Sequence, residues 1–213
     1  MSGGQPQRLE IEVKFYVDDL APLRERLLAA GAAQIKPRLF ERNVRFDDAQ
    51  GTLARRQQLL RVRQDDRARL TFKGQATGDA ASQAKVREEL EVEVSDALTI
   101  ATILQRLGFQ PRQVYEKYRE TFALDGVEIV LDELPFGNFV ELEGESRDGP
   151  GGQEAGIRRV AQRLGLDWEQ RIVDNYLSLM ARLKRHYALP FSDLTFDNFD
   201  GVDAPIHAIL QEE

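Results

Sequence analysis

The chain has 213 residues, of which 42% are hydrophobic and 31% charged, and its formal net charge is −7. This balance predicts a folded domain with a substantial core, and it excludes a disordered chain and argues against a general nucleic-acid binder. The sequence contains no Cys and only two His, which excludes disulfides and cysteine nucleophiles and argues against a histidine-rich metal site. We therefore expect the chemistry to depend on carboxylates, Lys and Arg.

The distribution of charge and apolar residues narrows the function further. No run approaches the length of a membrane span, and residues 1–10 lack the apolar core of a signal segment, so we expect a cytoplasmic protein. Residues 38–73 hold ten Lys and Arg against five Asp and Glu, whereas residues 188–213 hold six acidic residues and no Lys or Arg. A basic segment within an acidic protein favours a confined anion site over a broad basic surface.

Seven segments alternate apolar and charged residues with the two-residue period of a β-strand. They are 9–15, 60–63, 69–73, 87–94, 117–119, 128–132 and 139–143. In several of them the charged side carries a single sign, and such like charges repel unless an opposite charge lies between them. The pattern favours carboxylates and cations that face one another around a metal-bound polyanion. An ordinary solvated sheet face is the alternative.

Two amphipathic helices separate these strands, one expected within residues 18–31 and the other within 95–108. Each follows a Glu-x-Glu strand and precedes a strand that begins with an aromatic residue, Glu and a basic residue, so the two halves of the chain echo each other. The repeat predicts a closed or pseudo-symmetric β architecture. These helices and a helical region over 153–187 would cover its outer face, which makes the fold class α+β.

The last segment, residues 186–213, follows a domain that we place at residues 1–185. It is acidic but carries apolar residues such as Phe191, Leu194 and Ile206. It is therefore too apolar for a solvated tail, and we expect it to dock either on the domain or on a second subunit of a homodimer.

The opening Glu10-x-Glu12-x-Lys14 resembles the E-x-E-x-K signature of the CYTH family. This family contains class IV adenylyl cyclases, thiamine triphosphatases and inorganic triphosphatases, together called triphosphate tunnel metalloenzymes. Further motifs in the same order extend the resemblance over residues 8–182. They are Arg61-x-Arg63, Lys73 in Thr-Phe-Lys-Gly, Arg87-x-Glu89-x-Glu91, Lys117-x-Arg119, the block 131–143 and the closing element 175–180. The resemblance implies an eight-stranded antiparallel β-barrel that forms a tunnel, with the charged faces turned inward.

The resemblance also implies roles for individual side chains. The carboxylates that would hold Mg²⁺ or Mn²⁺ are Glu10, Glu12, Asp132, Glu141 and Glu143. The cations that would bind the triphosphate are Lys14, Arg61, Arg63, Lys73, Arg87, Lys117 and Arg119. The candidate catalytic residues are Glu10, Glu12, Lys14 and Lys73. Glu89 and Glu91 line the same tunnel by alternation.

The expected function is a metal-dependent triphosphatase acting on inorganic or small organic triphosphates. The alternatives are a class IV adenylyl cyclase and a non-catalytic polyphosphate or nucleotide sensor. The expected partner is a small-molecule triphosphate, with neither nucleic acid nor membrane involved. Arg45 stands where thiamine triphosphatases have an aromatic residue, and Asn175 stands where the closing element has Ser. A further phosphate ligand could be Arg171 or Lys184.

Overall fold

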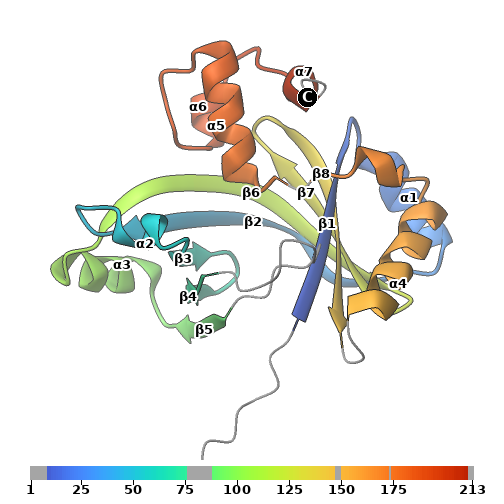
Figure 1. The fold of residues 1–213 in the computed structure, drawn as a ribbon, viewed down its shortest axis with the longest axis horizontal. Helices are drawn as coiled ribbons and strands as arrows, with labels where there is room; N and C mark the ends of the chain where they lie inside the picture. Colours follow the sequence, from blue (N-terminus) through green and yellow to red (C-terminus); the bar gives the residue numbers. More distant parts are fainter. Residues whose placement is uncertain (1–8, 76–87, 147–149, 173, 211–213) are drawn as a thin grey trace, which may run out of the picture.

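The computed structural model of the chain describes residues 9–75, 88–146, 150–172 and 174–210. Eight strands form one antiparallel sheet in the order β1-β8-β7-β6-β2-β3-β4-β5. The strands are β1 (Leu9–Val17), β2 (Ala33–Asp47), β3 (Leu59–Gln64), β4 (Ala68–Lys73), β5 (Glu89–Val94), β6 (Gln110–Leu124), β7 (Val127–Leu134) and β8 (Gly137–Ser146). The expected eight-stranded antiparallel architecture with helices is confirmed. Within the described residues no ladder joins β1 to β5, so the pairing there is that of an open, strongly curved sheet (Figure 1).

The order of the strands has the two-fold repetition that the sequence predicts. β2 and β6 are both 15 residues long and pair with each other at the centre, while β1 and β5 lie at the two edges. If β1, β2, β3 and β4 exchange places with β5, β6, β7 and β8, the sheet has the same strand order, counted from its other edge. The internal repeat in the sequence therefore corresponds to a repeat in the strand pairing.

Helices surround the sheet (Figure 1). Most pack on its apolar outer face, whereas the helix that begins with Tyr176 contacts the charged inner face. The helices are α1 (Ala21–Ala29), α2 (Thr52–Arg55), α3 (Ala97–Arg106), α4 (Pro150–Arg163), a 3-10 helix (Trp168–Gln170), α5 (Tyr176–Tyr187), α6 (Phe196–Phe199) and α7 (His207–Leu210). In the main core, Leu23 and Leu27 of α1 and Ile157 of α4 pack with Leu142 and Phe15 of the sheet, and all five are nearly inaccessible to solvent. In the described part of the chain, no helix has both the length and the apolar character needed to cross a membrane.

The helical region expected over 153–187 consists of two main helices. Gly165 adopts a left-handed φ of +70° just after α4, a conformation that favours Gly and ends a helix. Asn175 begins α5, because its side chain accepts hydrogen bonds from the N–H groups of Leu177 and Ser178. The break places Tyr176 at the first turn of α5, where its side chain is buried.

The segment after α5, residues 188–210, docks on the domain itself. We call it the C-terminal extension. The Leu194 N–H donates to the Val114 carbonyl at 2.9 Å, and the Glu116 N–H donates to the Leu194 carbonyl at 2.8 Å. Leu194 and Ile206 are buried in a second core together with residues of α5. The extension thus lies along the edge of β6 and buries its own apolar side chains.

Candidate functional site

A buried network of alternating charges lies on the inner face of β1, β8, β7 and β6. The Lys14 Nζ lies 3.0 Å from Oε1 of Glu141 and 3.2 Å from Oε1 of Glu12. The Arg119 Nη2 lies 2.6 Å from Oε2 of Glu141 and 2.6 Å from Oδ2 of Asp132. Lys14 lies directly opposite Glu141, and Arg119 directly opposite Asp132, on paired strands. The register of the strands therefore brings these predicted residues together.

Asp132 is fully buried and joins β6, β7 and α5. Its carboxylate accepts two hydrogen bonds from Arg119, one from the Lys117 Nζ at 3.0 Å and one from the Tyr176 hydroxyl at 2.9 Å. Three of these hydrogen bonds converge on Oδ2 and one reaches Oδ1, so both oxygens already have donors from the protein. In this structure Asp132 therefore anchors the cations, and its role as a metal ligand stays a prediction.

Tyr176 belongs to this site although its side chain was not among the predicted site residues. The Lys14 Nζ lies 4.2 Å from the centre of its ring, within the range of a cation–π contact. Burial raises the pKa of the Tyr176 hydroxyl well above its ordinary value, and the charge of Asp132 raises it further. Tyr176 therefore stays protonated as a hydrogen-bond donor. The only sequence signal for it was its place in the closing element 175–180.

Glu12 and Glu141 form the part of the site that fits a divalent cation. The charge of Glu141 raises the pKa of Glu12, while Lys14 opposes this, and the Glu12 side chain is 47% exposed to solvent. Burial alone would raise the pKa of Glu141, but Arg119 and Lys14 hold it well below its ordinary value. Glu141 is thus anionic and raises the pKa of the neighbouring Glu12, and the two carboxylates offer hard oxygen donors that suit Mg²⁺ or Mn²⁺. The residues present therefore fit the metal that the sequence predicts.

The rest of the predicted metal ligands are only partly placed. Glu143 lies directly opposite Glu12 across β1 and β8, on the same inner face. Glu10 lies in β1, but its side chain lies outside the described residues. Among the described side chains, no three His, Asp or Glu come together closely enough to hold a metal. The full ligand set stays a prediction.

The charge network continues from β6 to β2 and β3. The Lys117 Nζ lies 3.9 Å from Oε1 of Glu41, and the Arg63 Nε lies 3.5 Å from the same oxygen. Arg63 also donates to Oδ1 of Asn43 at 3.3 Å. Burial would raise the pKa of Glu41, but Lys117 and Arg63 lower it far below its ordinary value. A continuous chain of charged contacts therefore runs from Glu12 to Arg63.

Arg61 is a buried cation whose hydrogen-bond partners are neutral. Its Nη1 donates to the Tyr115 hydroxyl at 3.0 Å and its Nη2 to Oγ1 of Thr71 at 3.4 Å. Its Nε is buried and has no hydrogen-bond partner, and no carboxylate within the described ranges forms an ion pair with it. Burial opposes the charge of Arg61, but Tyr115 and the more distant carboxylates of Glu41 and Glu89 raise its pKa, so the guanidinium stays charged. Its unsatisfied Nε is therefore suited to an anion that comes from outside the chain.

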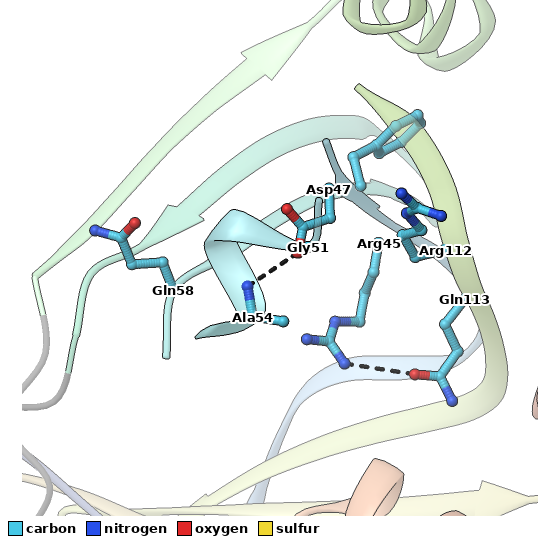
Figure 2. A pocket seen from close by; sticks show the side chains of 8 residues that line it. Arg45, Asp47, Gly51, Ala54, Gln58, Arg112 and Gln113 are labelled. Carbon is cyan, nitrogen blue, oxygen red and sulfur yellow. Dashed lines mark hydrogen bonds between the residues drawn. The ribbon is translucent and has the colours of Figure 1, made fainter. Parts of the chain in front are cut away.

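Arg45 lies directly opposite Arg61 on the paired strands β2 and β3. It lines a cavity of about 240 Å³ together with residues of α2 and with Arg112 and Gln113 (Figure 2). Burial lowers the pKa of Arg45, and the charge of Arg61 lowers it too, although Tyr115 opposes this. Like charges directly opposite one another are unfavourable unless an anion lies between them. The basic residue at position 45, where the family has an aromatic, was the signal for this side chain.

The remaining predicted residues lie around this group. Lys73 lies on the same face of β4 as Thr71, and its Nζ is 2.8 Å from Oε2 of Glu89. Glu91 accepts a hydrogen bond from Thr71 at 2.8 Å. Arg87 lies outside the described residues. Arg171 donates to the Trp168 carbonyl and Lys184 to the Ser192 hydroxyl, so within the described residues both contact partners away from the charge network.

A family model of the CYTH domain matches residues 8–176. The chain belongs to the CYTH family. A curated relative from Methanocaldococcus jannaschii, named as a candidate adenylate cyclase, is 29% identical over 137 residues, which are 63% of this chain and 76% of the relative.

Solved structures share the fold. The PH1012 protein of Pyrococcus horikoshii is 27% identical, with a TM-score of 0.65 over 79% of this chain and 97% of that one. A candidate adenylyl cyclase from Hippeastrum, described as having a dominant triphosphatase activity, is 19% identical, with a TM-score of 0.62 over 82% of this chain and 96% of that one. The CYTH match ends at Tyr176, so most of α5 and the C-terminal extension lie beyond it.

Proposed function

We propose that this CYTH protein is a metal-dependent triphosphatase that hydrolyses inorganic or small organic triphosphates. The observation that carries the proposal is Arg61, a buried guanidinium with neutral partners and an unsatisfied Nε. It lies two residues from Arg63 on β3, and Arg63 is one end of a charge network whose other end holds the carboxylates of Glu12 and Glu141. One end therefore offers cations to phosphate oxygens, and the other offers oxygen ligands to a metal.

Phosphoryl transfer requires positioning of the substrate and neutralisation of its charge, and different side chains of the site provide each. Arg61, Arg63 and Lys73 bind the phosphate oxygens, and the planar guanidinium groups can do so with two parallel hydrogen bonds. A divalent metal, when bound at Glu12 and Glu141, polarises the phosphoryl group as a Lewis acid.

A class IV adenylyl cyclase is the second candidate, and the name of the M. jannaschii relative favours it. In that reaction the ribose 3′-hydroxyl of ATP attacks the α-phosphorus and pyrophosphate leaves. The same cations and carboxylates would serve both reactions, so the products distinguish them.

The deciding experiment measures phosphate, pyrophosphate and cyclic AMP released from tripolyphosphate and from ATP, with Mg²⁺, with Mn²⁺ and with EDTA. We expect metal-dependent release of phosphate from tripolyphosphate without cyclic AMP. Cyclic AMP with an equal amount of pyrophosphate would establish the cyclase instead. Binding of tripolyphosphate without any turnover would contradict both and leave a sensor.

Glu12→Gln tests the carboxylate end of the site. The substitution removes one negative oxygen ligand, so we expect the Mg²⁺ concentration for half-maximal turnover to rise about tenfold or more. The measurement is a Mg²⁺ titration of tripolyphosphate hydrolysis at saturating substrate. The matched control is Glu25→Gln, which removes an exposed carboxylate on α1 and should leave the titration unchanged. An unshifted titration for Glu12→Gln would contradict its role as a ligand.

A further inference from the structure

We propose that the C-terminal extension is a working part of the substrate site, because it fixes Gln113 and Tyr115 of β6, which in turn hold Arg45 and Arg61. Gln113 and Tyr115 are positioning residues in this proposal. It rests on the proposed function to the extent that the two arginines bind phosphate. The extension lies beyond the residues that match the CYTH family model.

The extension takes the place of a strand beside one stretch of β6. β7 pairs with β6 only as far as Tyr118, and the extension begins its contacts just beyond that point. The Val114 N–H donates to Oδ1 of Asp193 at 2.8 Å, and the Val114 carbonyl accepts from the Leu194 N–H at 2.9 Å. The Glu116 N–H donates to the Leu194 carbonyl at 2.8 Å. The backbone on both sides of Tyr115 is therefore held by the extension.

Two side chains of β6 connect the extension to Arg45 and Arg61. The Gln113 Nε2 donates to the Ser192 carbonyl at 2.9 Å, and its Oε1 accepts from Nη1 of Arg45 at 3.4 Å (Figure 2). The hydroxyl of Tyr115, whose side chain is buried, accepts from Nη1 of Arg61 at 3.0 Å. One amide and one hydroxyl thus connect the extension to two cations on different strands.

The chemistry of these two contacts suits an anion site. Arg45 and Arg61 repel each other because they lie directly opposite on β2 and β3. Neutral acceptors hold the guanidinium groups in place without neutralising them, so their charge stays available for phosphate. Side chains that are ordered before binding lose less entropy when the ligand arrives. A carboxylate in the place of Gln113 or Tyr115 would compete with the substrate.

The extension is also held by apolar contacts that are independent of these hydrogen bonds. Leu194 is fully buried, and the Phe196 ring lies 5.4 Å from that of Tyr118. A single polar substitution can therefore loosen the hold on β6 without releasing the extension. This makes the proposal testable in the intact chain.

Asp193→Ala and Gln113→Ala are the test variants. We expect each to raise the KM for tripolyphosphate about 3- to 10-fold, the value for one lost hydrogen bond, with kcat within about twofold of wild type. Asp193→Asn keeps an acceptor for the Val114 N–H and should restore the wild-type KM. Asp203→Ala removes an exposed carboxylate from the same extension and serves as the control. An unchanged KM in both test variants, with the fold intact by circular dichroism, would overturn the proposal.

A double substitution tests the route through Tyr115. If the extension acts through the Tyr115 hydroxyl, Asp193→Ala should add little to the KM change of Tyr115→Phe. Fully multiplicative effects would overturn this route. If wild-type protein turns over no triphosphate, the proposed function fails, and calorimetric titration of the same variants with tripolyphosphate then decides the inference by the same fold-changes in Kd.

Discussion

Arg61→Met is expected to lower kcat/KM for tripolyphosphate about 100-fold while leaving the folded protein as stable as wild type or more stable. Charge-assisted hydrogen bonds contribute about 1.5–3 kcal/mol each, and the loss of about 2.7 kcal/mol corresponds to 100-fold in rate. The stability prediction follows from burial: the guanidinium has an unsatisfied Nε and, among the described residues, no carboxylate within ion-pair distance, so the thioether removes a buried charge without breaking an ion pair.

The measurement combines steady-state kinetics with urea unfolding of the same variant. Arg67→Met is the matched control, because Arg67 is exposed at the turn between β3 and β4 and forms a surface ion pair with Glu93. It should change neither kcat/KM nor the free energy of unfolding appreciably. A destabilised Arg61→Met with wild-type kinetics would show that Arg61 is structural and would contradict its assignment to the phosphate site.

Arg119→Met, unlike Arg61→Met, should destabilise the protein, by about 3–5 kcal/mol. Arg119 lies opposite Asp132 and contacts it at 2.6 and 2.7 Å, and it also reaches Glu141 at 2.6 Å. Its removal leaves two buried carboxylates with less counter-charge. For a chain of this size the loss corresponds to a fall in Tm of roughly 10 °C.

Thermal and urea unfolding measure this effect without requiring activity. The control is Arg163→Met, which removes an arginine whose ion pair with Asp125 at 2.9 Å is exposed to solvent. Surface pairs contribute at most about 1 kcal/mol, so this variant should unfold close to wild type. A free energy of unfolding for Arg119→Met within that range would contradict the structural role of the network.

The sequence predicted that both Arg61 and Arg119 belong to the site, but it did not predict that, among the described residues, only Arg119 of the two forms ion pairs with carboxylates. Alternation with a period of two put the charged residues of each strand on one side, and the resemblance to the CYTH family implied that these sides face inward together. The structure places Arg61 and Arg119 on the same inner face as Lys14 and Glu12. Alternation is a local property of a strand, so it can be read without knowing its neighbours. The internal repeat likewise predicted a pseudo-symmetric β architecture, in which the structure pairs β2 with β6 at the centre.

Sequence by itself thus determined the sheet, its two faces and the charged residues of the inner one. Only the tertiary structure decided which charges meet. The register of β6 against β7 pairs Arg119 with Asp132, while the register of β2 against β3 sets Arg45 against Arg61. The hydrogen bonds between the extension and β6 could not be predicted from the sequence either. Register and docking depend on contacts between segments far apart in the chain, which a local pattern does not contain.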